Sequence, residues 1–251
     1  MSHLHIPDGV IGAGWCLAGF VVTFILMFFF FSRLKKGFGR KIPLTGVAGA
    51  IMLLAMSVPL GLLPLHLGLA ALCGILLGPA LGFLAVFVVN VVLAFVGHGG
   101  ITVVGINTLI VGAEALLGAC FFRAAQRKMK AAKGAALATA LALLISTTLM
   151  LATVGAAAGV QELASLFQHK HYLHEEELEE DRSEFFQAHE EGRAPGPETA
   201  MAGVHFLRYT GLSALLLALL AGIALETAAT ALIVHYLAKV RPDYLFGQES
   251  S

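Results

Sequence analysis

The sequence predicts an all-α membrane protein, a polytopic helical bundle of about seven transmembrane segments. The first observation is composition: of 251 residues, 58% are hydrophobic and only 13% are charged, and the mean hydropathy is +0.84. Soluble globular domains carry about 25% charged residues. The second observation is that the apolar residues gather in long runs separated by short polar loops. Together these observations exclude an ordinary soluble enzyme.

Seven apolar runs follow one another along the chain, at residues 11–31, 43–63, 66–77, 80–96, 101–124, 135–159 and 208–238. Most are long enough to cross a hydrocarbon core about 30 Å thick. The run at 66–77 is too short for a full crossing at about 1.5 Å per residue, and it ends at Gly78-Pro79. We therefore expect a short or broken helix there. In membranes, such segments persist where they line a cavity or lie buried in protein.

Basic loops predict the orientation of the chain. Lysine and arginine gather at 32–41, at 123–133 and at 239–241. Because loops rich in these residues stay on the cytoplasmic side, seven alternating segments put the N-terminus outside and the C-terminus in the cytoplasm. All three basic loops then lie on the same face.

The same alternation puts His3, His5, His66 and His98 on the outer face. Pro7-Asp8-Gly9 has turn chemistry and is expected to hold the chain terminus on top of the first helix. A terminal amine, backbone amides and an imidazole form a planar nitrogen set that suits Ni(II), Cu(II) and related late divalent ions. Taken singly, each histidine is more often a capping or interfacial residue. Taken together, they predict a metal site.

Polar residues also occur inside the predicted spans. Glu114 and Glu226 are costly in hydrocarbon and should face the bundle interior. They are either bonded to a neighbouring helix or serve as coupling sites. Asn90 and Asn107 can bond between helices, and Asn107 could also orient a ligand without touching the metal.

The chain divides into three regions. Residues 1–159 form the predicted metal-binding membrane domain, with the N-terminal ligand segment and six apolar segments. Residues 160–207 form an acidic, histidine-containing extracytoplasmic loop, and 11 of the 16 acidic residues lie between 161 and 200. This loop is either a solvated hinge or a reservoir that concentrates divalent cations. Residues 208–251 supply the last span and a cytoplasmic tail.

Three motifs resemble those of a known family. They are His5-Ile6-Pro7-Asp8-Gly9, Pro64-Leu65-His66-Leu67-Gly68 leading to Leu77-Gly78-Pro79, and Gly99-Gly100-Ile101-Thr102-Val103-Val104-Gly105-Ile106-Asn107. In order and spacing they look like the CbiM/NikM family, the substrate-specific membrane subunits of energy-coupling-factor cobalt and nickel transporters. The resemblance covers roughly residues 1–160. It implies a metal ion near the outer face, held by the terminal amine, an amide, the histidine after the initiator methionine and a second histidine. His66 matches that second histidine.

The N-terminus departs from the family pattern. His5 matches the family's first histidine, yet Met1-Ser2-His3-Leu4 precedes it. Removal of Met1 would leave a Ser2 amine beside His3, whereas retention of Met1 would add one more amide. Both make His3 the chelating residue and His5 a further or supporting ligand; a later start is the third possibility. The candidate metal-binding residues are therefore Ser2, His3, His5 and His66. His98, Asn107 and Asp8 are the additional or supporting candidates.

The resemblance implies that Co2+ or Ni2+ is the transported substrate, with no organic cofactor. No G-x-x-x-x-G-K-[ST] nucleotide-binding motif occurs in the chain. ATP hydrolysis is therefore expected on separate ATPase subunits, joined through a transmembrane coupling (T) subunit. A small accessory membrane subunit is a further partner that the resemblance leaves open. Membrane lipid surrounds the chain, and no nucleic acid is expected.

The expected location is the cell membrane of a bacterium or archaeon, and the chain is expected to be a transport subunit and no enzyme. The alternative function is a secondary divalent-metal/proton carrier with Glu114 and Glu226 as proton sites.

Overall fold

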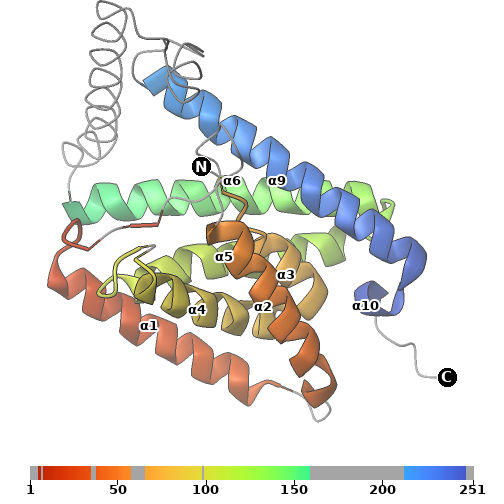
Figure 1. Cartoon of the computed structure of the whole chain (residues 1–251), viewed down its shortest axis with the longest axis horizontal. Coiled ribbons are helices and arrows are strands. Elements are labelled where there is room, and N and C mark those ends of the chain that lie inside the picture. The colour runs from red at the N-terminus through yellow and green to blue at the C-terminus, as the bar shows by residue number, and fades with distance from the viewer. Residues whose placement is uncertain are drawn as a thin grey trace, which may run out of the picture.

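The regular structure is helical wherever the chain is described. In the computed structural model these residues are 5–6, 8–34, 38–57, 66–97, 99–158 and 212–246. The helices are α1 (Ala13–Ser32), the 3₁₀ helix η1 (Phe38–Lys41), α2 (Ile42–Ser57), α3 (Ala70–Leu77), α4 (Pro79–Phe95), α5 (Val104–Ala125), α6 (Ala131–Ala158), α9 (Leu212–Val240) and α10 (Asp243–Phe246) (Figure 1). The predicted all-α class is confirmed for this part of the chain.

Four of these helices are long and apolar enough to cross a membrane. The qualifying stretches are Ala13–Ser32, Val104–Ala125, Ala131–Ala157 and Leu219–Val240; Ile42–Ser57 and Pro79–Phe95 are shorter apolar helices. Helix α1 shows the expected lipid-facing surface, since Phe24 is 54% and Phe28 is 77% exposed. The chain is thus built as a multi-pass membrane bundle. Seven spans and an external N-terminus remain predictions, and the loop at 160–207 lies outside the described residues.

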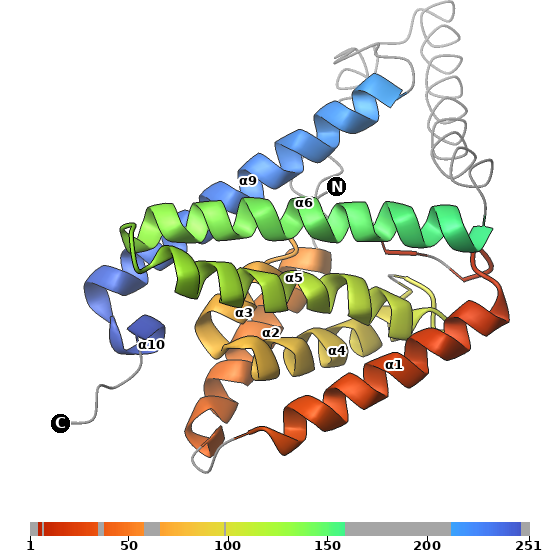
Figure 2. The same cartoon turned by 180° about the vertical axis from the view of Figure 1, so that it is seen from behind.

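Helix α5 is the centre of the bundle. It packs against α1, α3, α4 and α6, while α9 packs along α6; Figure 2 shows α5 and α6 side by side. Glycines allow these close approaches. A Cβ atom added at Gly105 would lie 2.5 Å from the Phe20 nitrogen, and one added at Gly112 would lie 2.5 Å from the Phe83 ring. Small residues at these crossings let helix backbones meet without a gap.

The short helix α3 confirms the predicted break in the third apolar run. Residues 66–69 are not helical, and α3 ends at Gly78, whose φ of +86° starts the turn into Pro79. A Cβ atom at Gly74 would lie 1.9 Å from the Ala115 carbonyl oxygen. Helix α3 is therefore seated directly on α5.

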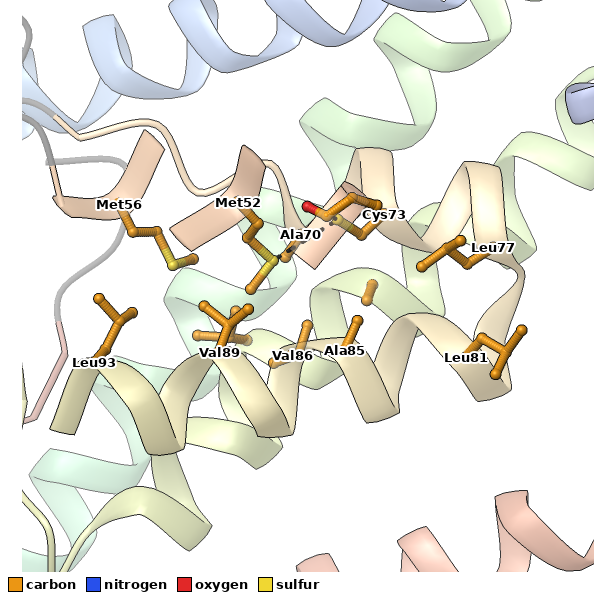
Figure 3. Close-up of a cluster of buried hydrophobic side chains, with 13 residues drawn as sticks. Met52, Met56, Ala70, Cys73, Leu77, Leu81, Ala85, Val86, Val89 and Leu93 are labelled. Carbon is orange, nitrogen blue, oxygen red and sulfur yellow. Dashed lines mark hydrogen bonds between the residues drawn. The ribbon is translucent and has the colours of Figure 1, made fainter. Parts of the chain in front are cut away.

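An apolar core joins α2, α3 and α4 beside this seat. Met52 and Met56 of α2, Cys73 of α3, and Val86 and Leu93 of α4 are all buried in it (Figure 3). The same cluster includes Val111 and Ala115 of α5, so α3 shares one core with α2, α4 and α5. The segment that carries His66 is thus joined to a helix packed within this core.

Candidate metal site

The segment that leads into α1 is held in the bundle through backbone contacts. Ile6 is 1% exposed and packs in a cluster with Val103, Ile106 and Val154. Its backbone N–H donates to Asn107 Oδ1 at 3.0 Å, and its carbonyl oxygen accepts from Asn107 Nδ2 at 3.1 Å. One asparagine amide therefore satisfies both polar backbone groups of the residue next to His5.

Asp8 fastens the same segment to the start of α5. The backbone N–H of Ile101 donates to Oδ2 at 2.9 Å, and that of Thr102 donates to Oδ1 at 2.9 Å. The Thr102 hydroxyl makes a further short bond to Oδ1. This hydroxyl is the main reason that the pKa of Asp8 lies below its ordinary value of 3.8, with the two N–H donors adding to it and desolvation opposing it. The Asp8 carboxylate thus binds backbone and hydroxyl donors.

Glycine is required where Asp8 meets the loop before α5. A Cβ atom at Gly100 would lie 2.2 Å from Asp8 Oδ1 and 2.5 Å from the Asp8 nitrogen. Gly99 has a φ of +96°, and a Cβ there would lie 3.3 Å from the His5 Cβ. The glycine loop therefore allows the N-terminal segment to lie directly against it.

The His5 ring reaches into the bundle and meets Asn90 of α4. His5 Nε2 lies 3.2 Å from Asn90 Oδ1, while Asn90 Nδ2 donates to the Thr108 hydroxyl of α5 at 3.3 Å. With the amide nitrogen directed to Thr108, the amide oxygen faces His5 and Nε2 is the protonated nitrogen of the neutral ring. This tautomer follows from the assigned amide orientation.

His66 lies at the start of the non-helical turn before α3. Leu69 has a φ of +57°, in the left-handed region that side chains with a branched Cβ or Cγ seldom occupy. Two fully buried carboxylates bind this turn. Glu226 of α9 accepts from the backbone N–H of Gly68 at 3.0 Å and of Leu69 at 2.7 Å. Glu114 of α5 accepts from Ala71 at 3.0 Å.

The two histidine-bearing segments, residues 5–6 and the 66–69 turn, are each held by side chains from core helices. The family described as the cobalt uptake substrate-specific transmembrane region, CbiM, matches residues 5–244. The chain belongs to the CbiM family. That match confirms the resemblance seen in the three motifs.

Curated relatives and solved structures are similar to this CbiM member over different lengths. A proposed metal transport protein of Methanocaldococcus jannaschii is 31% identical over 114 residues, 43% of this chain and 51% of that protein. Another from Haemophilus influenzae is 28% identical over 134 residues, 52% of this chain and 63% of that protein. The alignments thus span less than two thirds of either relative.

Two crystal structures share the fold. One is of a truncated transition metal transporter, with a TM-score of 0.64 and 17% identity, covering 94% of this chain and 99% of that one. The other is of a transition metal transporter, with a TM-score of 0.62 and 17% identity, covering 94% and 93%. At this identity they establish the fold of the CbiM chain alone.

The predicted site residues fall into two groups. His5, His66, Asp8 and Asn107 are described, whereas Ser2, His3 and His98 lie outside the described residues. Among the described residues, three or more His, Cys, Asp or Glu side chains do not gather at one point. Within this part of the CbiM chain, the imidazoles of His5 and His66 are the candidate ligands. Asn107 contacts the Ile6 backbone next to His5, and Asp8 contacts the backbone of Ile101 and Thr102.

Two contacts were not predicted from the sequence. Asn90 was expected to bond between helices, which it does through Thr108, but its contact with His5 was missed. Glu114 and Glu226 were expected either to bond a neighbouring helix or to act as coupling sites. The structure shows the first arrangement, with backbone N–H groups as the partners. For the two glutamates, an acid inside a span was the available signal.

Proposed function

We propose that the chain is the substrate-capture subunit of an ATP-driven cobalt/nickel uptake transporter, and that it binds the divalent metal near the outer face. The observation that carries this proposal is the insertion of His5 into the bundle. A chain terminus that supplied only a surface tail would not need Asn107 on both backbone groups of Ile6. Nor would it need Asp8 on two further backbone donors.

The proposed ligands are nitrogens from both segments. Ser2 or Met1 supplies the terminal amine, His3 supplies an amide and an imidazole, and His5 and His66 supply further imidazoles. Nitrogen donors in a planar set suit late divalent ions better than magnesium or calcium. Because amine, amide and imidazole must each lose or lack a proton to bind, metal affinity falls as the pH falls. The metal is the transported substrate, and no organic cofactor takes part.

Transport would require partners that supply energy. The proposed partners are a transmembrane coupling subunit and ATPase subunits of an energy-coupling-factor transporter, with or without a small accessory membrane subunit. The proposed location is the cell membrane of a bacterium or archaeon. His98 and the acidic loop at 160–207 are placed in this scheme as outer-face elements that assist capture.

The carrier alternative would use Glu114 and Glu226 as proton sites. In the structure, both carboxylates accept backbone N–H bonds at the start of α3. Protonation would remove the negative charge that strengthens those bonds in each cycle. Metal uptake that stops on ATP depletion favours the capture subunit, while uptake that persists without ATP or partner subunits favours the carrier.

The deciding experiment replaces one imidazole at the site and one away from it. His66→Ala should abolish accumulation of scarce cobalt or nickel in cells that contain the partner subunits, and it should weaken metal binding by the purified chain. His235→Ala is the matched control, because His235 is an exposed histidine of α9. Both variants should insert in the membrane at the parent level. If His66→Ala cells accumulate scarce metal normally, His66 is no ligand and the proposed site is wrong.

A further inference from the structure

Fold stability alone does not account for the two buried carboxylates. Glu114 and Glu226 are both 0% exposed, and they come from α5 and α9, helices far apart in the sequence. A buried carboxylate is costly unless it is well bonded. A bundle that needed only cohesion could use apolar side chains of the same volume at these positions. The groups that the two carboxylates contact therefore best explain why acids occupy these buried positions.

Both carboxylates contact the same short stretch of backbone. Glu226 spans two successive N–H groups, with Oε2 on Gly68 at 3.0 Å and Oε1 on Leu69 at 2.7 Å. Glu114 Oε1 takes the N–H of Ala71 at 3.0 Å. The N–H groups of Leu69 and Ala71 are among those that the start of α3 cannot satisfy within its own helix. The two side chains thus fix the turn from Gly68 to Ala71 at three points.

The turn itself is strained. Leu69 takes up a left-handed conformation with a φ of +57°, which is unfavourable for a non-glycine residue. Such conformations persist only where the surroundings hold them, and they gather at functional sites. Here the Leu69 N–H is the donor of the shorter Glu226 bond. Leu69, which is strained and bonded to Glu226, lies three residues after His66.

We infer that Glu226, assisted by Glu114, is a positioning residue for His66. The paired bonds to Gly68 and Leu69 set the path of the 66–69 turn and hold the imidazole ready for the metal ion. This inference rests on the proposed function, and it gives α9 a direct connection to the metal site. Outer residues that orient a metal ligand change metal affinity without touching the metal.

The test compares metal binding by purified full-length variants with binding by the parent, using Co(II) and Ni(II) alone as probes. Glu226→Ala removes both acceptors and should weaken binding by about 10- to 100-fold. Glu226→Gln retains one acceptor oxygen and should recover part of that loss. Thr230→Val is the matched control, since Thr230 lies one turn along α9 and is also 0% exposed; it should bind metal as the parent does.

A second measurement separates positioning from general stability. The visible absorption of bound Co(II) should shift in Glu226→Ala, because the His66 imidazole is displaced. Adding Glu226→Ala to His66→Ala should cause little further loss of affinity, since the carboxylate acts through that imidazole. Hydrogen exchange of the peptide that contains residues 66–71 should accelerate in the single variant and stay at the parent rate in Thr230→Val.

The outcomes are distinguishable from failure of the proposed function. If His66→Ala binds metal like the parent, the proposed site fails first. If His66→Ala loses binding while folded Glu226→Ala and Glu226→Gln retain parent affinity, only the positioning inference is wrong. It is also wrong if the losses from His66→Ala and Glu226→Ala add, or if every Glu226 variant fails to fold, since the carboxylate would then serve the bundle as a whole.

Discussion

The N-terminal segment and the 66–69 turn are two solutions to one problem. Both carry a histidine on irregular backbone, and both rely on side-chain carboxylates or amides for hydrogen bonds that a helix would supply. Asp8, which fastens the first, is exposed. Glu226 and Glu114, which fasten the second, are fully buried. A charge-assisted bond is worth more where water cannot replace it.

This difference indicates which ligand segment is fixed and which can move. The 66–69 turn is joined to α3, which is packed in one core with α2, α4 and α5 and approaches the α5 backbone at Gly74. The N-terminal segment is held by the amides of Asn90 and Asn107, the Asp8 carboxylate and the burial of Ile6. We therefore expect the 66–69 turn to be preformed and the N-terminal segment to close on the metal as it binds.

The largest effect should come from disturbing the seat of the fixed segment. In Gly74→Ala, the new methyl group would lie 1.9 Å from the Ala115 carbonyl oxygen, so α3 must move away from α5. Overpacking of this kind costs about 1–3 kcal/mol and occasionally more. Thermal unfolding in detergent should show a clear loss of stability together with weaker metal binding. Gly155→Ala is the control, because a Cβ atom there meets nothing within 4 Å; an equally stable Gly74→Ala would contradict the close seat.

A smaller and more selective effect should follow from Gly100→Ala. The added Cβ would lie 2.2 Å from Asp8 Oδ1 and would push the N-terminal segment off the glycine loop. Metal affinity should fall while the unfolding temperature stays near that of the parent, because α3 and its core are untouched. Gly14→Ala serves as the comparison, since its Cβ would meet nothing within 4 Å. A loss of stability as large as that of Gly74→Ala would show that the two segments are not independent.

The smallest effect should be the pH response of the Asp8 contacts. Hydrogen bonds, first that of the Thr102 hydroxyl, lower the pKa of Asp8 in the folded chain. A lowered pKa stabilises the fold above the unfolded value of about 3.9, and this contribution is lost as the pH falls through the folded pKa. Between pH 7 and 5, protection of the Ile101 and Thr102 amides from exchange should therefore stay constant in metal-free protein.

Asp8→Asn provides the comparison for that measurement. The amide can accept through one oxygen only, so protection of Ile101 or Thr102 should be lower at every pH. If protection in the parent decreased across this range, a group other than Asp8 would have to hold the loop.

Much of the helical framework could be predicted from the sequence, and the hydrogen-bond partners could not. Apolar runs and Gly78-Pro79 predicted α1 to α6 and the short third helix, because run length and turn residues act locally. The pairing of Glu226 with Gly68 joins residues 158 positions apart. Nothing in local sequence specifies which N–H group a buried acid will meet.

The candidate site was predictable to the same extent. His5 and His66 came from motif spacing, and Asn107 was expected to orient a ligand, which its contact with the Ile6 backbone supports. The role of Asp8 was left open between metal and backbone. Its contacts with Ile101 and Thr102 depend on how the glycine loop folds back against Asp8. Local sequence does not specify that fold.

We propose that both histidine-bearing segments bind one metal ion. Counting the imidazoles bound to that ion tests the proposal most directly. X-ray absorption of the Ni(II)-loaded parent, His5→Ala and His66→Ala proteins reports the imidazoles bound to the metal. We predict that the metal in His66→Ala has one imidazole ligand fewer. In His5→Ala, either the set of nitrogen ligands around the metal or the metal affinity should change. An unchanged nickel shell and unchanged affinity in both variants would contradict the claim and place the metal elsewhere.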